Sequence, residues 1–179
     1  MGREVRQLMG EAEKNLKKHI ARASLLDARL GAACLEDPAL GGLIRKLCDQ
    51  VHRTDSLMLS SGVAAACAGC AKTRGSCCFR EMGESYGFLQ LFVNRLLGAE
   101  LPPKSDFPGS CFFVGEKGCR LKVRHSFCLN YFCPDLTTTL GEQTILEIQR
   151  QVGKQLLAGW ELERALSRFV TSHSIPEHL

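Results

Sequence analysis

Four cysteines lie within twelve residues in the stretch CAGCAKTRGSCC, residues 67–78. A CxxC step lets the backbone turn through a tight knuckle with both sulfurs on one side, so Cys67 and Cys70 supply half of a tetrahedral metal site. The other ligands must come from elsewhere in the chain, and Cys128 and Cys133 are the natural candidates. A metal held in this way would tie distant segments together, so the arrangement of the cysteines decides the expected fold.

Eight of the ten cysteines fall between residues 67 and 133, a density that free thiols rarely reach without coordination or reactivity to explain it. The predicted metal ligands are Cys67, Cys70, Cys77, Cys78, Cys111, Cys119, Cys128 and Cys133. The neighbours Cys77 and Cys78 project their side chains apart, so only one of them is expected to share a centre with the CxxC pair. The sequence leaves open which one it is. Eight thiols also suffice for two four-ligand centres.

The number of thiols does not fix the metal, because one zinc ion and one [4Fe-4S] cluster each take four cysteines. The first residues form a charged amphipathic pattern without the apolar segment and cleavage site of a secretory signal, which predicts a cytoplasmic protein. Disulfides are disfavoured in that reducing compartment. We therefore predict an iron-sulfur cluster of the [4Fe-4S] type, with zinc as the alternative.

The cysteine pattern resembles the zinc- or iron-chelating cysteine-cluster family known as CxxCxxCC. The resemblance is carried by Cys67-x2-Cys70, Cys77-Cys78, Gly118-Cys119-Arg120-Leu121 and Phe127-Cys128-x4-Cys133. It covers 67 of the 179 residues and implies a metal site more strongly than a reaction. Many members are small bacterial proteins, and flagellin lysine N-methylase contains a related cluster. Two departures from the family pattern are the longer spacer of residues 71–76 and His125, which stands where proline is common.

Length and composition indicate one globular domain. The chain has 179 residues, of which 45% are hydrophobic and 23% charged. A net charge of +4 is too weak to predict nucleic-acid binding, and no apolar run approaches the roughly 18 residues of a membrane span. We divide the domain into an N-terminal helical hairpin (1–62), a cysteine-cluster core (63–138) and a C-terminal helical segment (139–179).

The hydrophobic pattern predicts a mainly α fold with a cysteine-rich loop and a short β-hairpin. Apolar residues recur at helical spacing from Val5 to about residue 30, and Asp37-Pro38 has the composition of a helix N-terminus that opens a second helix, with Gly62 just past its end. These two helices are expected to pack antiparallel. A third helix is expected over residues 88–97, closed by Gly98.

Two further elements complete the expected fold. Residues 112–114 and 119–123 form a hairpin around Gly115-Glu116-Lys117-Gly118, which places Cys111 opposite Cys119. The residues from Thr139 onward form one long helix or two helices that are broken near Gly159.

The remaining candidates have no firm role. Cys34 and Cys48 each stand alone beside helical apolar positions, so we interpret them as small buried hydrophobes. His125 is interpreted as a surface residue, and a role as a ligand, a proton relay or a hydrogen-bond donor to sulfur is left open. Tyr86 and Tyr131 are interpreted as packing residues. No phosphate loop, nucleophile elbow or HExxH motif is present, so whether the chain is an enzyme stays undecided.

The predicted function is a metal-binding protein with a redox or protein-modification role and a protein partner or substrate. The alternative is a structural-zinc module in which the metal only fixes the loops and a helical face binds a partner protein. An open coordination position would favour chemistry, whereas a closed set of four thiolates favours structure or electron transfer.

Overall fold

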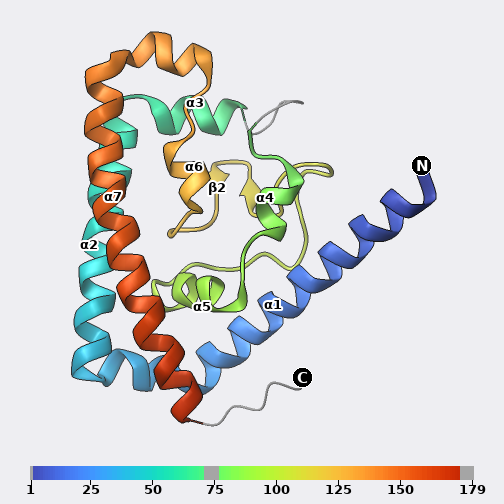
Figure 1. The fold of residues 1–179 in the computed structure, drawn as a ribbon, viewed down its shortest axis with the longest axis vertical. Coiled ribbons are helices and arrows are strands. Elements are labelled where there is room, and N and C mark those ends of the chain that lie inside the picture. The colour runs from blue at the N-terminus through green and yellow to red at the C-terminus, as the bar shows by residue number, and fades with distance from the viewer. Residues whose placement is uncertain (1, 71–76, 174–179) are drawn as a thin grey trace.

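Figure 1 shows the computed structural model of the protein, which describes residues 2–70 and 77–173, with side chains from residue 10 onward. Helices α2 (Pro38–Ser60) and α7 (Pro134–Ser172) run side by side, and α1 (Gly2–Glu36) leads away from them with α5 (Phe88–Leu96) packed against it. The shorter elements lie between these helices. The fold is mainly helical with one short hairpin, which confirms the predicted fold class.

The junction between α1 and α2 follows the predicted capping chemistry. The Asp37 carboxylate accepts hydrogen bonds from the backbone N–H groups of Ala39 and Leu40 at 2.9 and 2.8 Å, and Pro38 occupies the first helical position. The expected closed hairpin is wrong, however, because the two helices diverge from this junction (Figure 1). Helix α2 packs mainly along α7, and α1 packs mainly against α5. Each helix thus buries its apolar face against a later part of the chain.

The main core lies where the long helices meet α5 and the segment around residue 112. Its largest fully buried side chains include Leu16, Leu26, Leu47, Leu91, Phe92, Phe113, Leu162 and Leu166. Burying each of these contributes about 1.5–3 kcal/mol, so the helical frame is stabilised mostly by apolar burial. A second, smaller core of Met58, Val63, Leu129, Ile148 and Val152 lies beneath the cysteine-rich elements.

Helix α7 begins at Pro134, five residues before the predicted start, and its break lies elsewhere than predicted. Gly141 has φ of +74° and interrupts the helical backbone, a conformation that glycine adopts without strain. Gly159, where the break was expected, is helical and buried, and a side chain there would meet Leu47 Cδ1 at 3.9 Å. The helix therefore continues through Gly159, where it packs against α2 at ordinary contact distance.

The predicted hairpin is present but shorter. Strands β1 (Val114–Gly115) and β2 (Gly118–Cys119) pair antiparallel, with Val114 opposite Cys119. The expected opposition of Cys111 and Cys119 is therefore wrong, because the turn comprises only residues 116–117 and Cys111 lies beyond the paired residues.

Three short helices were not predicted: α3 (Val63–Cys70), α4 (Arg80–Glu84) and α6 (Ser126–Asn130). Helix α5 ends as expected, with Gly98 at φ of +78°. The side chains of Val5, Leu8 and Met9, the spacer residues 71–76 and His178 lie outside the described residues. Within the described ranges, no helix combines the length and the apolar character needed to cross a membrane.

Candidate metal centre

The CxxC pair lies in the last turn of α3 and not in the knuckle that the spacing suggested. Residues three apart on a helix share one face, so Cys67 and Cys70 still face the same side. Cys67 is half-buried and Cys70 is exposed. The small side chains of this helix let β2 approach it, since a Cβ on Gly118 would lie 3.6 Å from that of Ala68.

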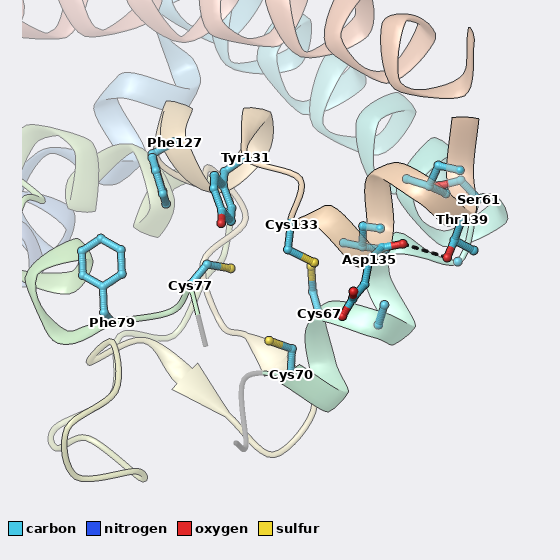
Figure 2. A pocket seen from close by; sticks show the side chains of 14 residues that line it. Ser61, Cys67, Cys70, Cys77, Phe79, Phe127, Tyr131, Cys133, Asp135 and Thr139 are labelled. Carbon is cyan, nitrogen blue, oxygen red and sulfur yellow. Dashed lines mark hydrogen bonds between the residues drawn. The ribbon is translucent and has the colours of Figure 1, made fainter. Parts of the chain in front are cut away.

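Four thiols converge on one cavity of about 600 Å³, which we call the CxxC cavity. Its sulfur-bearing residues are Cys67, Cys70, Cys77 and Cys133. In Figure 2 these four side chains come from three separate segments and point toward the same space. Cys133 is the N-cap residue of α7, so its position follows from where Pro134 starts that helix.

Aromatic and polar side chains line opposite sides of the CxxC cavity. Phe127 and Tyr131 stack with ring centroids 5.0 Å apart, and Phe79 meets Phe127 edge-on at 5.9 Å. On the other side, Figure 2 shows Asp135 and Thr139 of α7. Phe79 and Tyr131 are 40% and 44% exposed, so this cavity lies at the protein surface.

A second cavity of about 220 Å³ lies between α3, α6 and the hairpin, and we call it the hairpin cavity. Four of its thiols do not line the CxxC cavity: Cys78, Cys111, Cys119 and Cys128. Cys67 and Cys77 line both cavities and form part of the boundary between them. The eight predicted ligands are thus all brought together, in two adjoining sets of four.

Backbone amides already serve two thiols of the hairpin cavity. The N–H of Phe113 donates to the sulfur of Cys111, and the N–H of Leu121 donates to the sulfur of Cys119. In both cases the donor lies two residues after the cysteine. Such hydrogen bonds favour the thiolate, which is the form that binds metal.

The Cys77-Cys78 doublet spans the boundary. Cys77 lines the CxxC cavity, whereas Cys78 lines only the hairpin cavity, although their thiols hydrogen-bond to each other. The backbone carbonyl of Cys78 also accepts the N–H of Cys111 at 2.7 Å, which joins the doublet to the segment before β1. The side chain on the CxxC side is therefore that of Cys77.

Burial raises the pKa of six thiols: Cys67, Cys77, Cys78, Cys111, Cys119 and Cys128. The pKa of Cys67 is raised by burial and then by the neighbouring Cys77, while the Arg124 guanidinium opposes the increase. Burial, followed by neighbouring thiols, raises the pKa of Cys128 to about 12. These thiols are therefore protonated at neutral pH until a cation displaces their protons.

The donor set fits a soft metal. Four thiols in one cavity are the ligands that zinc and iron-sulfur clusters prefer. In the described parts of the chain, no group of three or more histidine, cysteine, aspartate or glutamate side chains is already placed to hold an ion. The thiol side chains would therefore have to reorient when metal binds.

His125 and Tyr86 support the hairpin cavity. His125 is the N-cap of α6, where its Nδ1 accepts the N–H of Phe127 at 3.2 Å, and its own N–H donates to the Tyr86 hydroxyl at 2.5 Å. Tyr86 is 3% exposed and lines the hairpin cavity. His125 lines neither thiol cavity, so its visible role is to start the helix that carries Cys128.

Asn94 is a buried polar residue that sequence reasoning missed. Its side-chain amide donates to the carbonyls of Gln90 and Val123 at 3.0 Å, and its oxygen accepts the N–H groups of Lys122 and Val123 at 2.9 Å. It therefore fixes the segment that leads to Arg124, whose guanidinium pairs with Asp55. A lone asparagine in an apolar helix was the only signal for it.

Cys34 lies fully buried in the main core, as predicted, and Cys48 is half-buried. Within the described residues, none of the ten cysteines forms a disulfide. Neither Cys34 nor Cys48 lines either thiol cavity, so they stand apart from the eight clustered residues.

Comparisons with known proteins add no assignment. No protein-family model matches the chain, and neither a curated protein nor a solved structure matches it. The resemblance of the cysteine spacing to the CxxCxxCC family therefore stays a prediction.

Proposed function

We propose that the protein binds metal in two adjoining four-thiolate centres and serves a redox or protein-modification role. The first centre would use Cys67, Cys70, Cys77 and Cys133, and the second Cys78, Cys111, Cys119 and Cys128. The observation that carries the proposal is the convergence of four thiols from three segments on the CxxC cavity. Thiols that serve only for packing need not share a solvent-filled space.

We propose a [4Fe-4S] cluster at this site in preference to a single zinc ion. Zinc and the cluster each take four thiolates, and the CxxC cavity has room for either. Eight clustered thiols suit the assembly of a cluster, which would supply one-electron chemistry when bound.

The surroundings support a role with a protein partner or substrate. Cys70, Phe79 and Tyr131 are all exposed beside the cavity, so a protein that docks over them comes close to the centre. In the hairpin cavity, the amides that donate to Cys111 and Cys119 would stabilise bound thiolates.

Anaerobic purification followed by iron, acid-labile sulfide and zinc analysis tests the proposal. We expect iron and sulfide together with broad visible absorbance that bleaches on addition of dithionite. A colourless protein with stoichiometric zinc would reject the cluster and favour the structural-zinc interaction module. A protein that binds neither metal would reject both functions.

A further inference from the structure

A third cavity lies beside the hairpin cavity and contains no thiol. It has a volume of about 220 Å³ and is lined from α7 by Gln155, Trp160 and Glu163, and from the other side by Gln90 and His125. At about 30 Å³ for each water molecule in the liquid, this space holds a ligand of about seven non-hydrogen atoms. We call it the Glu163 pocket.

Glu163 is a half-buried carboxylate without a partner. No cation or hydrogen-bond donor pairs with it among the described residues, in contrast to Glu161 one half-turn away, which pairs with Lys46 at 2.5 Å. Burial raises the pKa of the Glu163 carboxyl, and no neighbouring charge contributes. An unpaired carboxylate in this position is stabilised by any cation that enters the pocket.

Gln155 lines the pocket from the same helix as Glu163, eight residues away and thus about two turns along the wall. Its Oε1 accepts no hydrogen bond in the described structure, but this oxygen is fully buried and does not face the pocket. Glu163 is therefore the group on this helix that can receive a cation from the pocket.

The other charged residue on the wall does not compete for a cation. Arg124 lines the pocket, but its guanidinium pairs with Asp55. The indole of Trp160 adds an aromatic surface at the rim, where it is 55% exposed and where the Arg164 guanidinium lies 4.6 Å from the ring centroid. Because this ring already has a cation over it, the indole would contact the apolar part of a ligand, and the carboxylate its charge.

We propose that the Glu163 pocket binds a small alkylammonium ligand, with its charged nitrogen at Glu163 and its alkyl chain along Trp160 and Leu156. This inference does not depend on the metal centres. The pocket nevertheless adjoins the hairpin cavity through Tyr86 and Arg124, which line both.

Trp160 is the only tryptophan of the chain, so its fluorescence reports on this pocket alone. The full-length protein, as purified, is titrated with n-butylammonium chloride and, as an uncharged control of similar size, with n-butanol. We expect a saturable change with the amine and none with the alcohol. No saturable change with the amine, or equal responses to both, would overturn the proposal.

Two variants locate the binding. Glu163→Gln keeps the shape of the side chain and removes its charge, and we expect it to weaken amine binding roughly tenfold or more. The matched control is Glu161→Gln, which removes a carboxylate from the same helix outside the pocket and should leave binding unchanged. Unchanged binding in Glu163→Gln would contradict the assignment.

A measurement on the unaltered protein covers the case in which Glu163→Gln does not fold. Binding of n-butylammonium should shift the indole N–H resonance of Trp160 and the side-chain amide resonances of Gln155 in nuclear magnetic resonance spectra. Shifts confined to other residues would place the amine elsewhere and reject the pocket.

Discussion

The helical frame and the thiol region of this protein are stabilised by different means. The frame, formed by α1, α2, α5 and α7, buries large apolar side chains such as Leu47, Phe92 and Leu162. The thiol region, residues 63–70 and 77–133 without α5, consists of helices of at most eight residues and strands of two, packed around cavities lined by sulfur. Phe113, Leu121 and Leu129 of this region are buried, but helices and strands this short are not stable on their own, so we infer that metal supplies further cross-links there. The frame should persist without metal, and the thiol region should not.

The largest expected effect tests this difference directly. Cys67→Ser or Cys70→Ser should remove most of the metal and loosen the thiol region, because a hydroxyl is a poor substitute for a thiolate. Cys34→Ala and Cys48→Ala should leave the metal content intact, since neither residue lines a thiol cavity. Metal analysis together with hydrogen exchange measures both effects. Equal metal loss in Cys34→Ala would show that frame and thiol region are not separate.

The second prediction sharpens the division of the thiol region into two centres. Cys77→Ser should abolish the centre in the CxxC cavity, whereas Cys78→Ser should spare it and disturb the centre in the hairpin cavity. The unequal effect follows from the cavity that each side chain lines. Metal content and visible spectra of the two variants provide the comparison. Identical losses, or a structure with both sulfurs on one mononuclear ion, would reject the division.

The third prediction concerns the contact between the two regions. Asn94 belongs to α5 of the frame but holds Lys122 and Val123 of the thiol region. Asn94→Ala should lower the free energy of unfolding by about 2–4 kcal/mol, because it leaves buried amides without partners. Urea unfolding measures the change.

The control for this substitution is Asn130→Ala. Asn130 is exposed and makes one local hydrogen bond, to the Ser126 carbonyl at 3.0 Å, so its loss should cost much less. A loss in Asn94→Ala no larger than this control would show that the thiol region does not depend on its attachment to α5.

The sequence predicted the frame better than the thiol region. Helices α2 and α5 were found because Asp37-Pro38 and Gly98 mark their ends by local chemistry. The packing partners of α1 and α2 were missed. An amphipathic pattern predicts which face of a helix is buried, but it does not predict which element covers that face. Gly141 and Gly159 show the same limit of local sequence patterns. The helix is interrupted at Gly141 and continues through Gly159, and the presence of glycine alone did not predict which of the two would bend.

The thiol region was predicted by its residues and not by its geometry. All eight cysteines of this region were named. The expectation that only one of Cys77 and Cys78 shares a centre with the CxxC pair stays a prediction, because Cys77 lines both cavities and Cys78 lines only the hairpin cavity. Cys128 and Cys133 were both named as partners of the CxxC pair, but only Cys133 lines its cavity, whereas Cys128 lines the hairpin cavity with Cys111 and Cys119. This division depends on how distant segments fold together, and no local pattern encodes it. The helical form of the CxxC segment was missed because its spacing is the same in a knuckle and in a helix.

The smallest expected effect concerns the titration of Glu163, on the part of α7 that borders both regions. Burial raises the pKa of its carboxyl above the ordinary value of 4.5, so the unfolded chain ionises at lower pH than the folded protein. As pH rises from the pKa of Glu163 in the unfolded chain to its pKa in the folded protein, the wild-type protein loses stability. Above the folded pKa this loss is complete.

The glutamine of Glu163→Gln does not titrate. The free energy of unfolding of Glu163→Gln relative to wild type should therefore increase from about pH 4.5 to neutral pH. Metal contributions cancel in this difference when both proteins are equally loaded. Glu161→Gln, whose parent carboxylate forms an exposed ion pair with Lys46, should show no such gain. A difference for Glu163→Gln that does not vary with pH would mean that this carboxylate is as well solvated in the fold as in the unfolded chain.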